Sequence, residues 1–187
     1  DLQTINPGVC CGALPHHLSE PEKARALARA NIDAWLPHLQ TGAEAIVITA
    51  SGCGAQVQDY PHLLADDSEY REKAKQVAAA ARDLVQVLQQ EDLTLLKLEP
   101  SPQRTAIHTP CTLQHALHLN GAVDRLLGDL GYPLVEVADS HLCCGSAGTY
   151  SLTQPEISSQ LRERKLKALN IGTPQRIVTA NIGCQGQ

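Results

Sequence analysis

The stretch Leu142-Cys143-Cys144-Gly145-Ser146-Ala147-Gly148 contains two adjacent cysteines followed by glycine, and Cys10-Cys11-Gly12 repeats this triplet 133 positions earlier. Each triplet is followed by a Gly-Cys pair, Gly52-Cys53 in the first copy and Gly183-Cys184 in the second. Cys111 precedes the second triplet by 32 positions, and these motifs account for all seven cysteines of the chain. The repeat therefore indicates a protein built around thiolate ligands.

This cysteine pattern fits a disulfide framework poorly. Adjacent cysteines cannot easily bridge each other, and an odd number leaves one thiol unpaired. Nothing indicates secretion, since Asp1-Leu2-Gln3-Thr4 lacks the basic and apolar segments of a signal peptide. Metal or redox chemistry in a reducing compartment is expected instead, which predicts a cytoplasmic protein.

Length and charge argue against several classes of protein. The 187 residues, 43% of them hydrophobic, suffice for one domain or two small ones. The net charge of −5 argues against a nucleic-acid or anionic-membrane partner, and no apolar run approaches the ~20 residues that cross a bilayer. The chain contains no methionine, so we expect it to be an excised piece of a longer protein.

The repeat extends beyond the cysteines into signals for the start of a helix. Leu18-Ser19-Glu20-Pro21-Glu22 follows the first triplet, and Leu152-Thr153-Gln154-Pro155-Glu156 follows the second. Each combines a hydroxyl residue, a proline and a glutamate, which predicts a capping box. Residues at helical spacing then predict amphipathic helices, with buried stripes at Ala24, Leu27, Ala28, Asn31, Trp35 and Leu39 in the first and at Ile157, Leu161, Leu166 and Leu169 in the second.

Short β-branched runs alternate with these helices. The predicted strands are residues 44–50, 105–108, 133–138 and 175–180. Strands alternating with helices predict an α/β protein in which short parallel sheets are flanked by helices. Every cysteine motif except the first then lies just past the carboxyl end of a strand, where ligands collect in such sheets.

Two further helices and a linker complete the predicted organisation. Residues 68–90 carry a continuous stripe of small and apolar residues, and residues 113–130 form another amphipathic stretch. The proline-containing segment 99–103 is the expected linker. We therefore expect two pseudo-repeated domains, residues 1–100, in which the N-terminal part of the copy is missing, and residues 101–187, which stop just after the last motif cysteine.

Four thiols lie in the second copy, at Cys111, Cys143, Cys144 and Cys184. Four thiolates are the common ligand set of a cubane iron–sulfur cluster and of a structural zinc ion, and spacing does not decide between them. The first copy adds Cys10, Cys11 and Cys53, so all seven cysteines are candidate metal ligands. Glycines flank the thiols, where they permit either close approach of amides to an anionic cluster or tight turns.

Histidines near the thiols have several possible roles. His108 and His141 lie close in sequence to Cys111 and Cys143, so each is a candidate hydrogen-bond donor, proton carrier or substitute ligand. Elsewhere, a pair of histidines stands three positions apart on a predicted helix, a spacing that can hold a metal, at His115 and His118.

Charged residues near the second copy allow two interpretations each. Asp139 precedes the second triplet, where it is expected either to orient His141 or the cysteine-bearing loop, or to act as a cap. A basic run lies on the predicted helix that follows, at Arg162, Arg164, Lys165 and Lys167. Such a run is typical of a solvated helix face, with docking to an acidic partner as the alternative.

Three strings of residues carry a family resemblance. They are His108-Thr109-Pro110-Cys111-Thr112-Leu113-Gln114-His115, residues 139–150 around the second triplet, and Val178-Thr179-Ala180-Asn181-Ile182-Gly183-Cys184-Gln185. With the twofold cysteine pattern, the chain resembles the cysteine-rich CCG domain shared by heterodisulfide reductases, succinate dehydrogenase variants, lactate-utilisation proteins and glycolate oxidase iron–sulfur subunits. The flanking residues narrow the resemblance to the last of these, over essentially the whole chain.

The resemblance implies an electron-transfer part of an oxidoreductase rather than a catalytic chain. Flavin-containing partner subunits would oxidise glycolate to glyoxylate, and the electrons would pass toward the quinone pool. It also implies a [4Fe–4S] cluster, which an isolated piece can lose, at Cys111, Cys143, Cys144 and Cys184. The complex would be cytoplasmic, with a peripheral position at the inner face of the membrane left open. In that family a ferredoxin-like domain precedes the repeats, and none of it is in this sequence.

The sequence departs from the fullest form of the pattern, which ends in Cys-x-x-Cys. Asn181 and Gln187 stand around Cys184, and Ala50 and Gln56 stand around Cys53, so each copy lacks one thiol. The upstream cysteine of the first copy would fall before residue 1. The missing thiols argue against a thiol/disulfide redox protein of the heterodisulfide reductase type. That class stays as an alternative, beside a structural zinc-binding or subunit-docking module.

Overall fold

The computed structural model describes residue 2 and residues 8–187. The chain divides into two compact units. Unit 1 contains the described residues up to Ile48 together with Gly52–Asp83, and unit 2 contains Thr49–Ser51 together with Leu84–Gln187. The two repeats predicted from the sequence, residues 1–100 and 101–187, are not defined in the same way as these spatial units. The boundary between the repeats stays a prediction.

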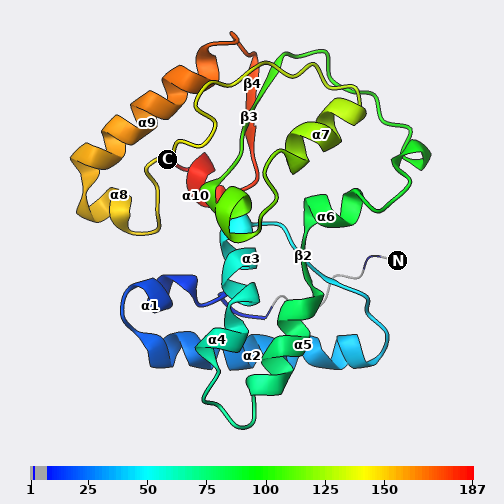
Figure 1. Cartoon of the computed structure of the whole chain (residues 1–187), viewed down its shortest axis with the longest axis vertical. Coiled ribbons are helices and arrows are strands. Elements are labelled where there is room, and N and C mark those ends of the chain that lie inside the picture. The colour runs from blue at the N-terminus through cyan, green and yellow to red at the C-terminus, as the bar shows by residue number, and fades with distance from the viewer. Residues whose placement is uncertain (1, 3–7) are drawn as a thin grey trace. The chain divides into compact units, whose positions relative to one another are not determined.

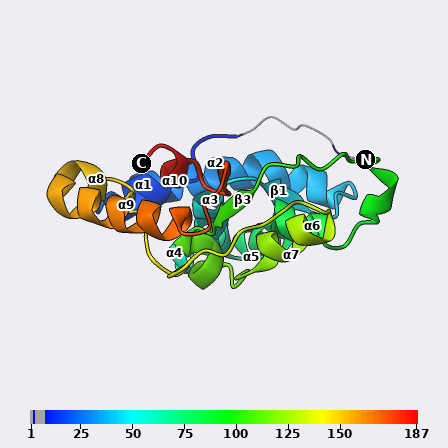
Figure 2. The same cartoon turned by 90° about the horizontal axis from the view of Figure 1, so that it is seen from above.

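Unit 1 combines one long helix with a pair of short parallel strands. Its elements are α1 (Ala13–His17), α2 (Pro21–Gln40), β1 (Ile46–Ile48), α3 (Ser51–Gln58), α4 (Tyr60–Leu63), α5 (Arg71–Ala80) and β2 (Ala81–Asp83). Helix α2 packs against α1 and α5, and Figure 2 shows α2 and α5 as separate layers. The inner face of α2 buries Ala24, Ala28, Ile32 and Trp35 in one cluster with Tyr60. Cys11 of the first triplet packs against this core.

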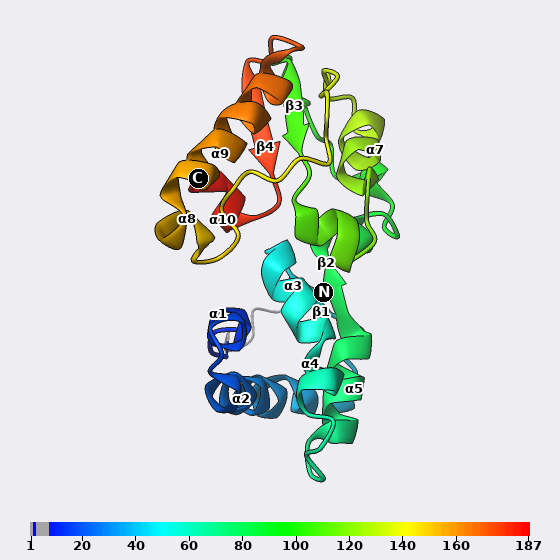
Figure 3. The ribbon, with the colours of Figure 1, turned by 60° about the vertical axis from the view of Figure 1, so that its left-hand side comes forward.

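Unit 2 is organised around a second pair of parallel strands. Its elements are α6 (Leu84–Leu88), the 3₁₀ turn Leu93–Leu95, β3 (Thr105–His108), the π-helical turn Thr112–Ala116, α7 (Ala122–Asp129), α8 (Tyr150–Thr153), α9 (Pro155–Asn170), β4 (Arg176–Thr179) and α10 (Ile182–Gln185). The strands pair from Thr105 opposite Arg176 to His108 opposite Thr179. Figures 1 and 3 show α9 on one side of the strand pair and α7 on the other. All four residues of β3 are buried.

The α/β class expected from the sequence is confirmed, because both units contain short parallel strands flanked by helices. The predicted strands over residues 44–50, 105–108 and 175–180 correspond to β1, β3 and β4. Over the described part of the chain, no helix combines the length and the apolar character needed to cross a membrane.

The single helix predicted over residues 68–90 is wrong in its middle. Helix α5 ends at Ala80, and the next three residues form β2 before α6 begins. Ala81 adopts extended angles, with φ −68° and ψ 127°, and pairs with Ile46 of β1. Backbone groups of β1 need hydrogen-bond partners when they are half-buried, and this requirement outweighs the local helix propensity of the segment.

Neither predicted capping box forms. Helix α2 begins at Pro21 and α9 begins at Pro155, and neither N-cap residue, Glu20 or Gln154, makes a side-chain hydrogen bond to the helix start. Proline suits the first helical position because its φ is already helical and its missing N–H would have had no partner there. The prolines therefore mark both helix starts without help from Ser19 or Thr153.

The region after Cys111 is less regular than predicted. The helix expected over residues 113–130 is divided into the π-helical turn and α7, with left-handed residues between them at His118 (φ 55°) and Gly121 (φ 69°). The strand expected over residues 133–138 reduces to one parallel bridge between Leu134 and Thr105. The predicted helix is thus interrupted in its middle, and the predicted strand is mostly replaced by irregular backbone.

The buried stripe predicted for α9 is also wrong in part. Ile157 and Leu166 are exposed, whereas Leu169 is buried as expected. The helix instead buries Ser158 and Lys165. Lys165, expected on a solvated face, is only 2% exposed. Its burial places a cation inside the unit, close to the cysteines.

Candidate metal centre

The strand pair of unit 2 brings distant cysteines to one edge. Because β3 and β4 are parallel, their carboxyl ends meet at the same edge, with His108 opposite Thr179. Cys111 follows the end of β3, and Cys184 lies in α10 just after β4. Figure 3 shows α10 directly beyond the end of β4. The convergence of these two thiols follows from the topology alone.

Cys143 and Cys144 complete a group of four thiols in unit 2. The Cys184 thiol donates to Cys144, which lowers the pKa of Cys144 to about 6 and raises the pKa of Cys184. Burial raises the pKa of Cys111, and the charges of Cys143 and Cys144 add to this effect. The four thiols therefore lie close enough for each to affect the ionisation of the others, as the ligands of one metal centre do.

His108 is the histidine that the structure brings to these thiols. One ring nitrogen of His108 and the Sγ atoms of Cys144 and Cys184 all lie within 4.8 Å of one another. Burial lowers the pKa of His108 to about 4, and the nearby Lys165 cation acts in the same direction. The imidazole is therefore neutral near pH 7, which is the form that can bind a metal or accept a hydrogen bond.

Among the described residues, this group contains none of the other histidines named from the sequence. His141, His115 and His118 are exposed. His115 belongs to the π-helical turn and His118 has a left-handed backbone, so the two do not share a face of an α-helix. Asp139 is also exposed and left-handed, with φ 46°.

Backbone amides of the second triplet point toward the thiols. The amide N of Gly145 donates to Cys143 Sγ over 3.3 Å, and the amide of Ser146 helps to lower the pKa of Cys144. Gly145 has φ 90°, and a Cβ there would lie 2.5 Å from the carbonyl oxygen of Ser158 on α9. Only glycine therefore allows this loop to reach the helix while its amides face the thiols.

Two buried side chains hold the cysteine-bearing segments of unit 2 together. Gln114 Nε2 donates to the carbonyl oxygens of Thr109 (2.7 Å) and Ser140 (3.2 Å), and so links the segments that lead to Cys111 and to Cys143. Lys165 Nζ donates to the same Ser140 oxygen over 2.8 Å. The two loops are thereby tied to each other and to α9.

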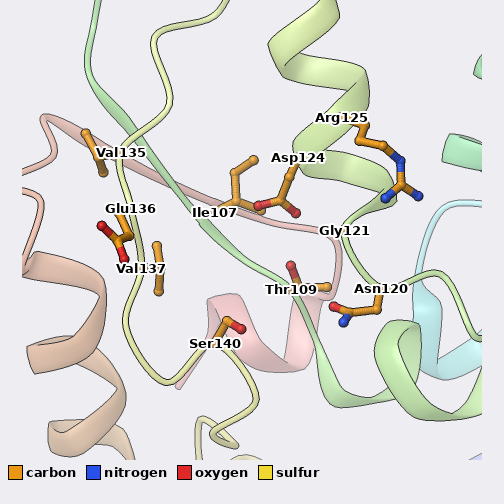
Figure 4. Close-up of a pocket in the computed structure, with 10 residues that line it drawn as sticks. All are labelled: Ile107, Thr109, Asn120, Gly121, Asp124, Arg125, Val135, Glu136, Val137 and Ser140. Atoms are coloured by element: carbon orange, nitrogen blue, oxygen red, sulfur yellow. The ribbon is translucent and has the colours of Figure 1, made fainter.

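A cavity of about 450 Å³ lies beside these segments but contains none of the cysteines. Thr109 and Ser140 line it, together with the charged residues Asp124, Arg125 and Glu136 (Figure 4). The cavity and the group of thiols thus have different lining residues.

Unit 1 brings together its three cysteines in a similar way. Cys11 donates to Cys53, which raises the pKa of Cys11 and lowers the pKa of Cys53 to about 7. Cys10 is hydrogen-bonded to Cys11, and the amide of Ala13 also donates to Cys11. Cys53 lies in the first turn of α3, just after β1. The first copy thus forms a three-thiol group at an equivalent edge.

Neutral side chains support the first triplet. Asn31, fully buried on α2, donates through Nδ2 to the Cys10 carbonyl (3.1 Å) and to Tyr60 Oη (2.9 Å), and accepts from the amide of Val9 (2.9 Å). The hydroxyl of Tyr60 donates in turn to the Cys11 carbonyl over 2.9 Å. These hydrogen bonds hold the backbone of the first triplet against α2 and Tyr60.

Glutamine stands three positions after the last motif cysteine in both units, at one of the two places expected for the missing thiol. Gln56 lies one turn after Cys53 on α3 and is 5% exposed, with Oε1 3.3 Å from His16 Nδ1 and with no partner for Nε2. Gln187 Nε2 instead donates to Ser158 Oγ over 2.7 Å. Asn181 accepts from the Gly183 amide and caps α10. Both departures from the fullest pattern thus have structural roles.

The donor set fits an iron–sulfur cluster. All seven cysteines are free thiols, four of them grouped in unit 2 beside a neutral imidazole and inward-facing amides. Two buried polar atoms without partners, Gln56 Nε2 in unit 1 and Thr179 Oγ1 in unit 2, lie on the elements that carry Cys53 and lead to Cys184. Buried polar atoms without a partner are expected beside a bound group that forms hydrogen bonds with them.

Comparison with known proteins agrees with this geometry. The cysteine-rich domain family CCG matches residues 2–58 and 105–187, which hold every cysteine of both sites. The chain belongs to this cysteine-rich domain family.

Proteins similar in sequence to this chain are named as iron–sulfur subunits and as lactate utilization proteins. The chain is 54% identical to the glycolate oxidase iron-sulfur subunit of Escherichia coli (strain K12), over 98% of this chain and 45% of that protein. It is 33% identical to a Bacillus subtilis (strain 168) protein named "Probable glycolate oxidase iron-sulfur subunit", over 94% and 39%. It is 29% identical to lactate utilization protein A of Exiguobacterium sp. (strain ATCC BAA-1283 / AT1b), over 94% and 71%. The chain spans less than half the length of the first two relatives.

Sequence reasoning missed the role of Lys165. The basic run predicted a solvated position for this lysine, although the repeat indicates that the position is buried. Lys165 follows Pro155 by ten positions, just as the predicted core residue Asn31 follows Pro21. Aligning the two helices at their prolines places Lys165 at the position of Asn31, and so predicts that it is buried beside the loop of the second triplet.

Proposed function

We propose that this chain is the cysteine-rich part of an iron–sulfur electron-transfer subunit in a glycolate-oxidising complex. The observation that carries the proposal is the convergence of Cys111, Cys143, Cys144 and Cys184 at one strand edge of unit 2. The 54% identity to the glycolate oxidase iron-sulfur subunit of Escherichia coli supports the choice of substrate.

In this proposal the four thiols of unit 2 hold one [4Fe–4S] cluster, which when bound takes up and releases single electrons. Cys10, Cys11 and Cys53 supply three ligands of a second metal site in unit 1. Neighbouring residues orient these cysteine ligands. The backbone amides of Gly145 and Ser146 donate to cysteine sulfur atoms, and Gln114 links the two loops that carry Cys111 and Cys143.

The proposed reaction needs partners that accept its electrons and protons. Oxidation of glycolate to glyoxylate releases two electrons and two protons, which a flavin in partner subunits would accept. The flavin would return the protons to solvent and pass its electrons singly to this subunit. A quinone would take up the two electrons with two protons from water and become a quinol. We place the complex in the cytoplasm, at the inner face of the membrane that holds the quinone.

A structural zinc site is the second candidate function. The group His108, Cys144 and Cys184 is a mixed imidazole and thiolate set of the kind that binds zinc. Zinc would hold the strand ends together and would transfer no electrons. The substitution His108→Ala separates the two candidates: it would release zinc from such a site but leave the iron content of a four-thiolate cluster unchanged. The exposed His141 provides the control substitution, His141→Ala.

An anaerobic assay of iron, acid-labile sulfide and zinc, read beside the visible spectrum, tests the proposal. About four irons and four sulfides for the unit 2 site, with a broad absorption that bleaches on reduction, is the expected result. A colourless protein containing zinc and no sulfide would overturn the electron-transfer function in favour of the structural one.

A further inference from the structure

Lys165 is a basic residue buried inside unit 2. Its side chain is 2% exposed and its Nζ donates to the Ser140 carbonyl oxygen over 2.8 Å. Among the residues that the structure describes, it forms no ion pair with a carboxylate. An isolated ammonium group is costly to bury, and one carbonyl hydrogen bond offsets only part of that cost. The fold therefore holds a positive charge that needs a nearby negative charge.

The cysteines of unit 2 supply this negative charge when their thiols are ionised. Burial lowers the pKa of Lys165, whereas Cys144, Cys184 and Cys143, in that order, act to raise it. Asp139 acts in the same direction more weakly, and its carboxylate is exposed and screened by water. Of the other charged groups in the basic run, Arg164 and Lys167 are exposed and Arg162 is half-buried.

Unit 1 provides the same position without the charge. Asn31 and Lys165 each lie ten residues after the proline that starts their helix, each is buried, and each donates to a backbone carbonyl of a triplet loop. Asn31 binds the Cys10 carbonyl and Lys165 binds the Ser140 carbonyl. Both side chains support a loop, so support alone does not require a lysine.

We infer that Lys165 is the counter-charge of the metal centre in unit 2, and that it makes this centre easier to reduce. The inference rests on the proposed function, since a cluster with four thiolates is anionic and gains a further negative charge on reduction. A fixed cation in a dry environment stabilises the more negative state more strongly. An amide at the same position, as in unit 1, would not.

Charge and support are separated by four substitutions. Lys165→Met removes the charge and keeps most of the length of the side chain. Lys165→Asn introduces the residue of unit 1. Lys165→Arg keeps the charge. Lys167→Met removes a charge from the exposed side of the same helix and is the matched control.

The potential of the unit 2 cluster would be measured by anaerobic titration with dithionite, which supplies the electron, and followed by visible absorption and EPR. For Lys165→Met and Lys165→Asn we expect about a tenfold loss in the one-electron reduction equilibrium, a shift of about 59 mV to lower potential. Lys165→Arg and Lys167→Met should stay at the wild-type potential. Unchanged potentials in folded Lys165→Met and Lys165→Asn proteins with full iron and sulfide would overturn the inference.

A second measurement keeps the two proposals distinguishable. Absence of iron and sulfide from the wild-type protein would refute the cluster, not the counter-charge. In that case Co²⁺ is titrated anaerobically into the metal-free protein, because a metal bound by several thiolates is also anionic. Lys165→Met should then bind Co²⁺ about tenfold more weakly than wild type or Lys167→Met, and equal affinities would overturn the inference.

Discussion

The two cysteine sites use the same scaffold with different supports beneath it. In unit 1 the first triplet rests on Asn31 and Tyr60, which are neutral and satisfy each other. In unit 2, Gln114 and Lys165 both donate to the carbonyl of Ser140, in the loop that leads to the second triplet. The glycine of each triplet lies against the first turn of its helix, at Ala24 or Ser158. The comparison teaches that the backbone geometry of the repeat can be kept while the charge below the ligands changes.

The closeness of loop and helix differs most clearly at the triplet glycines. Gly145→Ala is expected to lower the free energy of unfolding by about 3–5 kcal/mol, because the new Cβ meets a backbone oxygen at 2.5 Å with φ at 90°. Gly12→Ala should cost about 1–2 kcal/mol, since its nearest backbone oxygen is 3.2 Å away at φ 86°.

Chemical denaturation of both glycine variants checks this difference. Gly148→Ala is the control for backbone conformation alone, because Gly148 has φ 64° and open space around it. Equal losses for Gly145→Ala and Gly12→Ala would show that the two loops do not differ in their approach to the helix.

The support beneath the first triplet predicts the next largest effect. Asn31→Ala leaves the Cys10 carbonyl, the Val9 amide and the hydroxyl of Tyr60 without their partner, at an expected cost of about 2–3 kcal/mol. Asn170→Ala on α9 is the matched control, because that exposed side chain donates only to the Leu166 carbonyl. Similar unfolding midpoints for the two variants would contradict the supporting role of Asn31.

The smallest expected effect concerns the pH at which thiols become reactive in the metal-free protein. The pKa of Cys144 is lowered to about 6 and that of Cys53 to about 7, because each accepts a hydrogen bond from a second thiol. Thiolate forms as the pH rises through each pKa, so alkylation of Cys144 should reach half of its maximal rate about one pH unit below Cys53. Peptide mapping after iodoacetamide pulses measures both, and the reverse order would refute the assignment of donors and acceptors.

Much of this architecture is predictable because it depends on short-range patterns. The β-branched runs before Cys53, Cys111 and Cys184 predict strands, and parallel pairing then places those thiols at the carboxyl ends. The grouping of the cysteines therefore follows from the sequence. The ligand assignment itself stays a prediction.

The rest depends on contacts that a local pattern does not contain. The segment after Ala80 has strong helix propensity, yet it forms β2 because β1 needs a partner. Lys165 has a surface residue's character, yet it is buried because its helix faces the second triplet. In both cases a distant part of the chain outweighs the local preference.

The iron and sulfide contents of Cys144→Ser and Cys53→Ser proteins, prepared anaerobically beside the wild type, test the ligand assignment most directly. Cys144→Ser should lose about four irons and four sulfides together with the visible absorption of the unit 2 cluster. Cys53→Ser, which changes the equivalent position of the incomplete site, should retain them. Wild-type iron and sulfide in Cys144→Ser would contradict a cluster held by the four thiols of unit 2.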